Sequence, residues 1–149
     1  MQVGEFCNRE VIIIGSDESV KDAAELMRRH HVGDVVLVEE REGRRVPVGI
    51  ITDRDLVLEV MVPGLEPEAL AVKDIVTSAL SNVRVDDSLF DALEMMRAKA
   101  IRRLPVVDAD GALAGILTVD DVMALLTEML GRLSAVVERQ RSREARQRP

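Results

Sequence analysis

Two motifs of the form Thr-x-x-Asp hold the residues best suited to chemistry in this chain, namely Thr52 with Asp55 and Thr118 with Asp121. Each follows a short apolar run and opens an amphipathic pattern, so we expect each where a strand runs into a helix. The free N–H groups and the positive dipole end of such a helix can hold an anion. The same spacing also forms a capping box, which stabilises any helix start, and the two roles can coexist.

Catalysis is not indicated by any motif. His30 and His31 are neighbours, so their side chains diverge and do not form the i, i+4 pair of a zinc helix. Their place at a helix end favours an interaction with the helix dipole. Cys7 belongs to no recognisable nucleophile motif and is interpreted as a small buried hydrophobe. We therefore predict that the chain is not an enzyme, with no catalytic residue, no metal ligand and no required cofactor.

The composition of the 149 residues is 47% hydrophobic and 32% charged with a net charge of −7, which is typical of one or two small globular domains. Apolar runs are too short for a membrane span, and the N-terminus lacks the features of a signal peptide. We therefore expect a cytoplasmic protein without a membrane partner. Net acidity and the absence of Trp and Tyr argue against nucleic acid as a partner.

The sequence is duplicated. A constant offset of 69 residues relates the two copies through matched pairs such as Asp17 with Asp86, Ala23 with Ala92, and Met27 with Met96. After Val38 the offset becomes 66, because the first copy is expected to have a longer charged loop at residues 39–45. The second copy has a tight Asp-Ala-Asp-Gly turn at residues 108–111 in that place.

Each copy predicts the same elements, a short opening helix followed by β-α-β-β-α. In the first copy these are helix 3–6, strand 11–14, a helix opened by residues 16–19, strands 35–38 and 48–52, and a helix from Asp53. In the second they are helix 72–76, strand 82–85, a helix opened by residues 86–88, strands 104–107 and 112–118, and a helix from Val119.

The fold class is therefore predicted as α/β, more strictly α+β, with two repeats. A unit of about 60 residues is only marginally stable alone, so we expect a pseudo-twofold pair that shares a sheet interface and has two equivalent clefts. The expected domains are repeat 1 at 1–60, a linker with Pro and Gly at 61–71, repeat 2 at 72–130 and a basic helical or flexible tail at 131–149.

Four stretches carry a resemblance to the CBS domain that extends over about residues 3–130, nearly everything outside the tail. They are His-Val-Gly-Asp-Val-Val-Leu-Val at 31–38, Gly-Ile-Ile-Thr-Asp-Arg-Asp-Leu at 49–56, Ile-Arg-Arg-Leu-Pro-Val-Val-Asp at 101–108 and Gly-Ile-Leu-Thr-Val-Asp-Asp-Val at 115–122. The chain thus looks like a stand-alone CBS pair, or Bateman module. The resemblance implies adenosyl ligands (AMP, ADP, ATP, NAD or S-adenosylmethionine) in the clefts between the repeats. The threonine hydroxyl would reach the phosphate and the aspartate would accept from the ribose.

Adenine recognition in the family uses the first strand and the loop before the second, through backbone groups and apolar contacts. By resemblance this indicates Ile12, Ile13, Val35 and Val36 in one half, and Ser81, Asn82, Leu104 and Pro105 in the other. The apolar members of this set would be core residues in any α/β protein. Ser81 and Asn82 are polar where the first copy has isoleucines, and they fit a plain edge strand equally well.

The two motifs differ in charge. Arg54 precedes Asp55 and is a donor suited to phosphate, whereas Asp120 takes the equivalent place in the second copy and would repel a polyphosphate. We predict that the cleft using Thr52, Arg54 and Asp55 prefers charged nucleotides. The other cleft should be weaker, empty or occupied by a less anionic adenosyl ligand.

Residues 131–149 contain six Arg and two Glu and continue a helical pattern. They are either a solvated helix end or a docking segment for an acidic partner, a sister subunit or nucleic acid. The resemblance further implies a homodimer. We interpret the chain as a regulatory module that reports ligand occupancy to an unidentified protein partner through a population shift. The alternative is a ligand-free dimerisation or interaction scaffold whose Thr-x-x-Asp motifs only cap helices.

Overall fold

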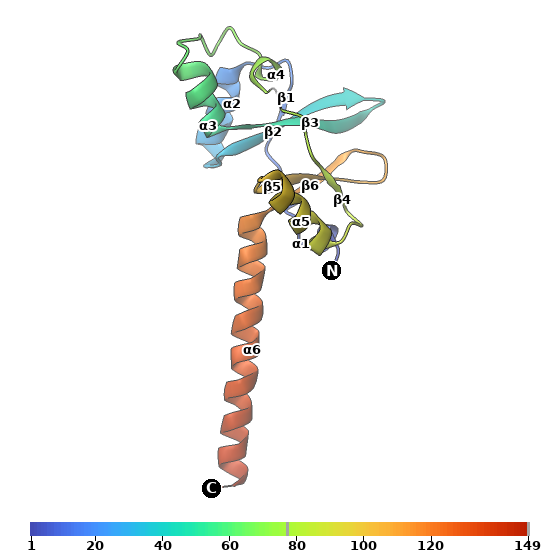
Figure 1. Cartoon of the computed structure of the whole chain (residues 1–149), viewed down its shortest axis with the longest axis vertical. Coiled ribbons are helices and arrows are strands. Elements are labelled where there is room, and N and C mark those ends of the chain that lie inside the picture. Colours follow the sequence, from blue (N-terminus) through green and yellow to red (C-terminus); the bar gives the residue numbers. More distant parts are fainter. Residues whose placement is uncertain (77, 149) are drawn as a thin grey trace.

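The computed structural model describes residues 1–76 and 78–148, which form two stacked repeats and one long projecting helix (Figure 1). The first half of the chain contains α1 (Val3–Phe6), β1 (Ile13–Gly15), α2 (Val20–His30), β2 (Asp34–Arg41), β3 (Arg44–Thr52), α3 (Asp53–Leu56) and a π-helical turn, η1 (Val57–Met61). The second half contains α4 (Val72–Ile75), β4 (Val83–Arg84), α5 (Leu89–Lys99), β5 (Arg103–Val107), β6 (Leu113–Thr118) and α6 (Val119–Gln147).

Two three-stranded sheets carry the fold, in the orders β1-β2-β3 and β4-β5-β6. In each sheet the first strand is parallel to the second, and the second is antiparallel to the third. The helix between the first two strands makes the crossover that parallel neighbours require. The mixed α/β fold of two β-α-β-β-α repeats is thus confirmed.

Each sheet is covered by helices on one face and by the other sheet on its opposite face. In β2, Val35 and Leu37 belong to the core beneath the helices, whereas Val36 and Val38 belong to a cluster that includes Ile116 of the other sheet. This double burial explains the uninterrupted apolar run of β2. The helices bury the expected stripe, which is Val20, Ala23 and Met27 in α2 and Leu89, Ala92 and Met96 in α5.

The short opening helices are exchanged between the repeats, so that α1 lies with the second repeat and α4 with the first (Figure 1). Val3 is fully buried in the core of the second repeat, and its N–H donates to the Asp87 carbonyl at 2.9 Å. Val72 is fully buried in the core of the first, and its N–H donates to the Glu18 carbonyl at 2.9 Å. Each repeat therefore needs a segment that precedes the other.

This exchange predicts that Val72→Ala destabilises the first repeat although the residue precedes the second. The loss of two buried methyl groups should lower the free energy of unfolding by about 2 kcal/mol. Urea denaturation measures it, with Phe90→Ala as the control, because the Phe90 side chain is exposed. Equal effects of the two substitutions would contradict the packing.

The prediction of a charged loop at residues 39–45 is wrong. β2 and β3 continue through this stretch as a hairpin in which Arg41 pairs with Arg44 across a turn at Glu42 and Gly43. Both turn residues have positive φ, 54° and 75°, as a two-residue hairpin turn of type I′ requires. The arms extend beyond the core, so their residues are charged and carry no apolar alternation that would indicate a strand.

The two closing helices differ strongly in length. The helix from Asp53 ends after a π-helical turn at Met61, whereas α6 runs for 29 residues and points away from the body (Figure 1). The histidine pair lies at the C-terminal end of α2, where His31 adopts the left-handed conformation. In the described part of the chain, no helix combines the length and apolarity needed to cross a membrane.

Candidate functional site

A cavity of about 360 Å³ lies between the two repeats at the Thr52 motif. The first half contributes the end of β3 and the start of α3, and the second contributes the segments that lead into β4 and β5. The lining residues are Ile50, Thr52, Asp55, Val76, Ser78, Ala79, Leu80, Ser81, Ile101, Arg102 and Arg103. The cavity therefore combines apolar walls, small polar groups, one carboxylate and two guanidinium groups.

Thr52 and Asp55 form a complete capping box at the start of α3. The Thr52 N–H donates to Asp55 Oδ2 at 2.8 Å, and the Asp55 N–H donates to Thr52 Oγ1 at 3.2 Å. The two bonds hold the Thr52 and Asp55 side chains in place where β3 ends and α3 begins, which is at the wall of the cavity. The capping role is present, and contact of the same residues with a ligand stays a prediction.

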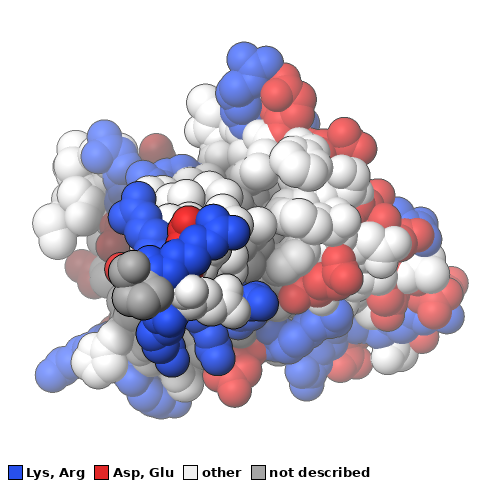
Figure 2. Space-filling model, turned by 90° about the horizontal axis from the view of Figure 1, so that it is seen from below, with Lys and Arg blue, Asp and Glu red and all other residues white. Residues whose placement is uncertain are grey.

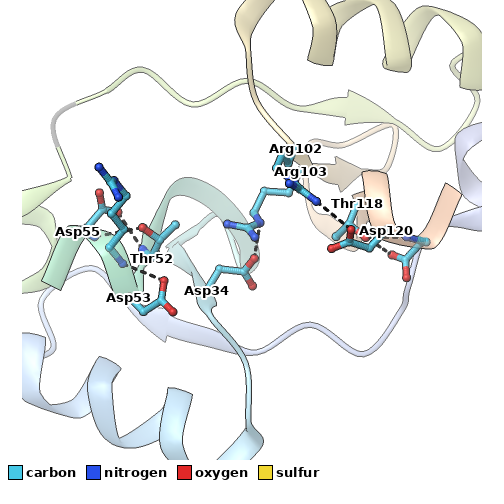
Figure 3. Close-up of polar contacts among 10 residues, drawn as sticks. Asp34, Thr52, Asp53, Asp55, Arg102, Arg103, Thr118 and Asp120 are labelled. Atoms are coloured by element: carbon cyan, nitrogen blue, oxygen red, sulfur yellow. Dashed lines mark hydrogen bonds and ion pairs between the residues drawn. The ribbon is translucent and has the colours of Figure 1, made fainter. Parts of the chain in front are cut away.

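Two arginines of the second repeat reach this cavity, and each is paired with an aspartate. Arg103 Nε lies 2.5 Å from Asp34 Oδ2 in the first repeat, so this half-buried pair crosses between the repeats. Arg102 Nη2 lies 3.0 Å from Asp120 Oδ1 in the first turn of α6. Figure 3 shows the Arg103–Asp34 pair between the two Thr-x-x-Asp motifs, with Arg102 turned toward Asp120.

The pair between Arg103 and Asp34 is incompletely satisfied. The Arg103 Nε–H is buried and finds no hydrogen-bond acceptor among the described residues, because the nearby carboxylate lies off the N–H direction. Burial raises the pKa of the Asp34 carboxyl above its ordinary value; the Arg103 charge opposes the rise, and the Asp53 charge adds to it. The ionised form of Asp34 is therefore held less firmly than that of an exposed aspartate.

The second motif has different surroundings. Thr118 Oγ1 donates to Asp121 Oδ2 at 2.8 Å and accepts from the Asp121 N–H at 3.1 Å. The segment around Asn8 lies against β6 through two backbone hydrogen bonds with Ile116, at 2.8 and 2.9 Å. Asp121 lines a hollow of about 390 Å³ together with Glu5, Phe6, Asn8, Ala124, Leu125 and Glu128. Three carboxylates face this hollow, but Arg54 and Asp120, on which the predicted difference between the two clefts rests, line neither cavity, so that difference stays a prediction.

Of the residues predicted for ligand binding, the structure brings Thr52, Asp55 and Ser81 together in the first cavity. Arg54 and Asn82 are exposed and lie outside its lining, as does Thr118. Asp121 lines the other hollow.

The apolar candidates are mostly core residues. Val35, Val36, Leu104 and Pro105 are almost completely buried and their side chains do not line the cavity, so only their backbone groups are left for the predicted contact with adenine, which stays a prediction. The reason is that alternate residues of a strand buried on both faces point into the helix-covered core or the other sheet. Ile12 packs against the first core and Ile13 between the sheets.

The sequence reading missed Arg102 and Arg103, which directly precede the strand that holds Leu104. A signal was available, since the first copy has Gly33 and Asp34 at the matching positions. An arginine matched to an aspartate across a pseudo-twofold axis predicts a pair at that axis. Among the described residues, no group of three or more His, Cys, Asp and Glu side chains could hold a metal ion.

Comparison with known proteins agrees with this architecture. The chain matches the CBS domain family twice, over residues 3–62 and 72–128, and therefore belongs to that family as a tandem CBS pair. Such pairs are regulatory modules.

A relative and two solved structures are representative of the matches. An uncharacterized protein of Methanopyrus kandleri is 39% identical over 123 residues, which are 83% of this chain and 61% of that protein. The structure of Hypoxic Response Protein I with two coordinated zinc ions has a TM-score of 0.73 and 27% identity, covering 83% of this chain and 98% of the other. A CBS domain protein of Pyrobaculum aerophilum in complex with AMP has a TM-score of 0.74 and 24% identity, covering 88% and 99%.

Proposed function

We propose that this chain binds an adenosyl ligand (AMP, ADP, ATP, NAD or S-adenosylmethionine) in the cavity between its repeats and signals occupancy to a partner protein in the cytoplasm. The observation that carries the proposal is the placement of Thr52 and Asp55 of one repeat opposite Arg102 and Arg103 of the other. One ligand that touches both walls would bind differently to two arrangements of the repeats.

The chemistry of the walls supports this class of ligand. A volume of about 360 Å³ falls within the range of small-molecule sites, roughly 300–1,000 Å³. Ile50, Val76 and Ile101 offer apolar surface for a flat base, and the arginines offer donors for phosphate. Asp55 can accept from ribose hydroxyls through the oxygen that its cap does not use. A protein of the same fold binds AMP.

Arg103 can couple ligand binding in the cavity to the relative arrangement of the two repeats. A phosphate in the cavity would compete with Asp34 for the guanidinium, and would thereby loosen a contact that joins the two repeats. Arg102 would in the same way be drawn from Asp120 at the start of α6. The ligand would then favour the arrangement in which these pairs are open, since only differential affinity shifts a population.

This competition predicts that Asp34→Asn tightens the binding of AMP at neutral pH, by about tenfold, because Arg103 is no longer held by a charge. Protonation of Asp34 has the same effect as the substitution. In the parent chain affinity should therefore rise as pH falls through the raised pKa of Asp34, and the variant should lack that part of the pH dependence. Calorimetric titrations across pH measure both effects.

Asp86→Asn is the control for this prediction, because Asp86 is exposed and pairs with Arg84 outside the cavity. It should bind and titrate like the parent. Weaker binding by Asp34→Asn, or a pH dependence equal to that of the parent, would argue against the competition.

A ligand-free dimerisation scaffold is the second candidate, favoured by the capping role that Thr52 and Thr118 have at the starts of α3 and α6. The substitutions Asp55→Ala and Asp121→Ala separate the two functions, because each removes the hydrogen bond that the threonine of its motif donates to the carboxylate, but only Asp55 lines the cavity between the repeats. We expect Asp55→Ala to abolish the calorimetric signal of the adenosyl ligands while Asp121→Ala retains it. If neither variant nor parent binds any of them, the scaffold is correct.

A further inference from the structure

The two guanidinium groups that line the cavity between the repeats are held in different surroundings. Arg103 pairs with Asp34 between the two Thr-x-x-Asp motifs, whereas Arg102 is turned toward Asp120 at the start of α6 (Figure 3). The Arg103 pair is half-buried, but the side chains of Arg102 and Asp120 are 69% and 73% exposed. Arg103 is therefore the cation next to the Thr52 motif, and Arg102 lies at the solvent side toward α6.

The backbone fixes Arg102 beside Asp120. The N–H of Val119, the first residue of α6, donates to the Arg102 carbonyl at 2.9 Å. The Arg102 guanidinium then pairs with the carboxylate of the next residue, Asp120, at 3.0 Å. Because both contacts are made with the first turn of one helix, Arg102 is held on the α6 side of the cavity.

The first repeat makes the same backbone contact without the ion pair. The Asp53 N–H at the start of α3 donates to the Gly33 carbonyl at 3.0 Å. Gly33 has no side chain at the position that matches Arg102, and Arg54 stands where the second repeat has Asp120. The backbone bond is thus sufficient to begin the closing helix, so the fold does not require the pair between Arg102 and Asp120.

The part of α6 next to this pair is acidic. Residues 119–130 contain three carboxylates and no Lys or Arg. The arginines of the helix begin at Arg132, and seen from below the Lys and Arg side chains gather around its tip, away from the cavity (Figure 2). A chain of phosphates that extends past Arg103 toward α6 would therefore meet one guanidinium that is already paired, and then carboxylates.

We propose that the pair between Arg102 and Asp120 makes this cavity select a nucleoside monophosphate over a triphosphate. A single phosphate near Thr52 needs only Arg103, which lies next to that motif. The outer phosphates of a triphosphate need Arg102, and binding them separates Arg102 from Asp120 and leaves that carboxylate unpaired beside like charge. The volume of about 360 Å³, near the lower end of the range for small-molecule sites, also favours the smaller ligand.

Asp120 is then a positioning residue that acts through Arg102 and sets how many phosphates the cavity accepts. This inference rests on the proposed function and names the class of ligand for the same site. The matching cleft of the other half cannot discriminate in this way, because Gly33 and Arg54 replace the two members of the pair.

Calorimetric titration of the full chain with AMP and with ATP tests the selection, in EDTA so that no divalent cation offsets the phosphate charge. The parent should bind AMP more tightly than ATP. Asp120→Asn should raise the affinity for ATP about three- to fivefold and change that for AMP less than about twofold, since a pair between exposed side chains shifts an equilibrium by up to about fivefold. The ratio of the two affinities is the readout, because a general effect on folding would not change it.

Two further variants show whether Asp120 acts through Arg102. Adding Arg102→Ala to the Asp120→Asn chain should remove the gain in ATP affinity. Asp86→Asn, which removes an exposed carboxylate outside the cavity, should bind both nucleotides like the parent. The inference is overturned, while the proposed function stands, if the parent binds ATP at least as tightly as AMP, if Asp120→Asn changes both affinities by the same factor, or if Asp86→Asn changes their ratio equally. Binding of neither nucleotide would overturn both.

Discussion

Replacing Arg103 by alanine is expected to weaken the binding of AMP or ATP by about 10- to 100-fold. A hydrogen bond to a charged group contributes about 1.5–3 kcal/mol, and Arg103 lines the cavity, where its guanidinium can turn from Asp34 to a phosphate. The substitution also leaves Asp34 without its cation. Because burial already raises the pKa of Asp34, that carboxyl should then become protonated at a still higher pH.

Arg54→Ala is the matched control for this loss. Arg54 is the arginine that the sequence favours as the phosphate donor, but its side chain is exposed and outside the cavity lining. Its removal should change the affinity by less than about threefold, the effect of a screened surface charge. If Arg54→Ala impairs binding and Arg103→Ala does not, the site is organised as the sequence alone predicted.

Gly115→Ala is expected to lower the free energy of unfolding by about 3 kcal/mol. A Cβ atom at this position would lie 2.7 Å from the backbone carbonyl oxygen of Asn8 and 2.8 Å from Cys7 Sγ. The segment at Asn8 must then move away from β6, which strains or breaks the two hydrogen bonds with Ile116. Chemical denaturation followed by circular dichroism measures the change.

The same substitution at Gly131 should not lower the free energy of unfolding. Gly131 lies inside α6 with open space around its Cα, and alanine is favoured over glycine in a helix by about 0.8–1 kcal/mol. Gly131→Ala should therefore leave the stability unchanged or raise it. A loss at Gly131 as large as that at Gly115 would contradict the close approach of the Asn8 segment to β6.

The duplicated pattern made most of the fold predictable. The offset of 69 residues placed the motifs of one repeat on those of the other, and the Ser, Thr and Asp residues before each apolar pattern marked the helix starts. Ser19, Thr52 and Thr118 indeed cap α2, α3 and α6. These signals are local, so the sequence alone carries them.

The exchange of α1 and α4 was not predictable in this way, because Val3 and Val72 are apolar residues that either core would accept. The extension of β2 and β3 into a hairpin around Glu42 and Gly43 was not predicted, for a different reason. They lie beyond the core, so their charged residues show no alternation, and backbone pairing alone maintains them.

The candidate site was predictable only in part. Thr52 and Asp55 could be identified because their spacing is that of a motif at the start of a helix. Arg102 and Arg103 belong to no such motif and reach the cavity only because the second repeat packs against the first. Strands that are buried on both faces also make site residues hard to predict, since Val35 and Leu104 lie near the site in sequence but their side chains are buried in the core. Sites formed between repeats depend on contacts that no single motif encodes.

The most direct test of ligand binding is equilibrium dialysis of the nucleic-acid-free protein against millimolar AMP or ATP, measured by absorbance at 260 nm. The chain has no Trp, no Tyr and two Phe, so its own absorbance there is small and bound adenine is counted directly. We predict an excess of one adenine per chain for the tighter ligand, which Arg103→Ala reduces and Arg54→Ala retains. No excess with either nucleotide, or an equal excess in both variants at nucleotide concentrations that half-saturate the parent, would contradict a nucleotide site between the repeats.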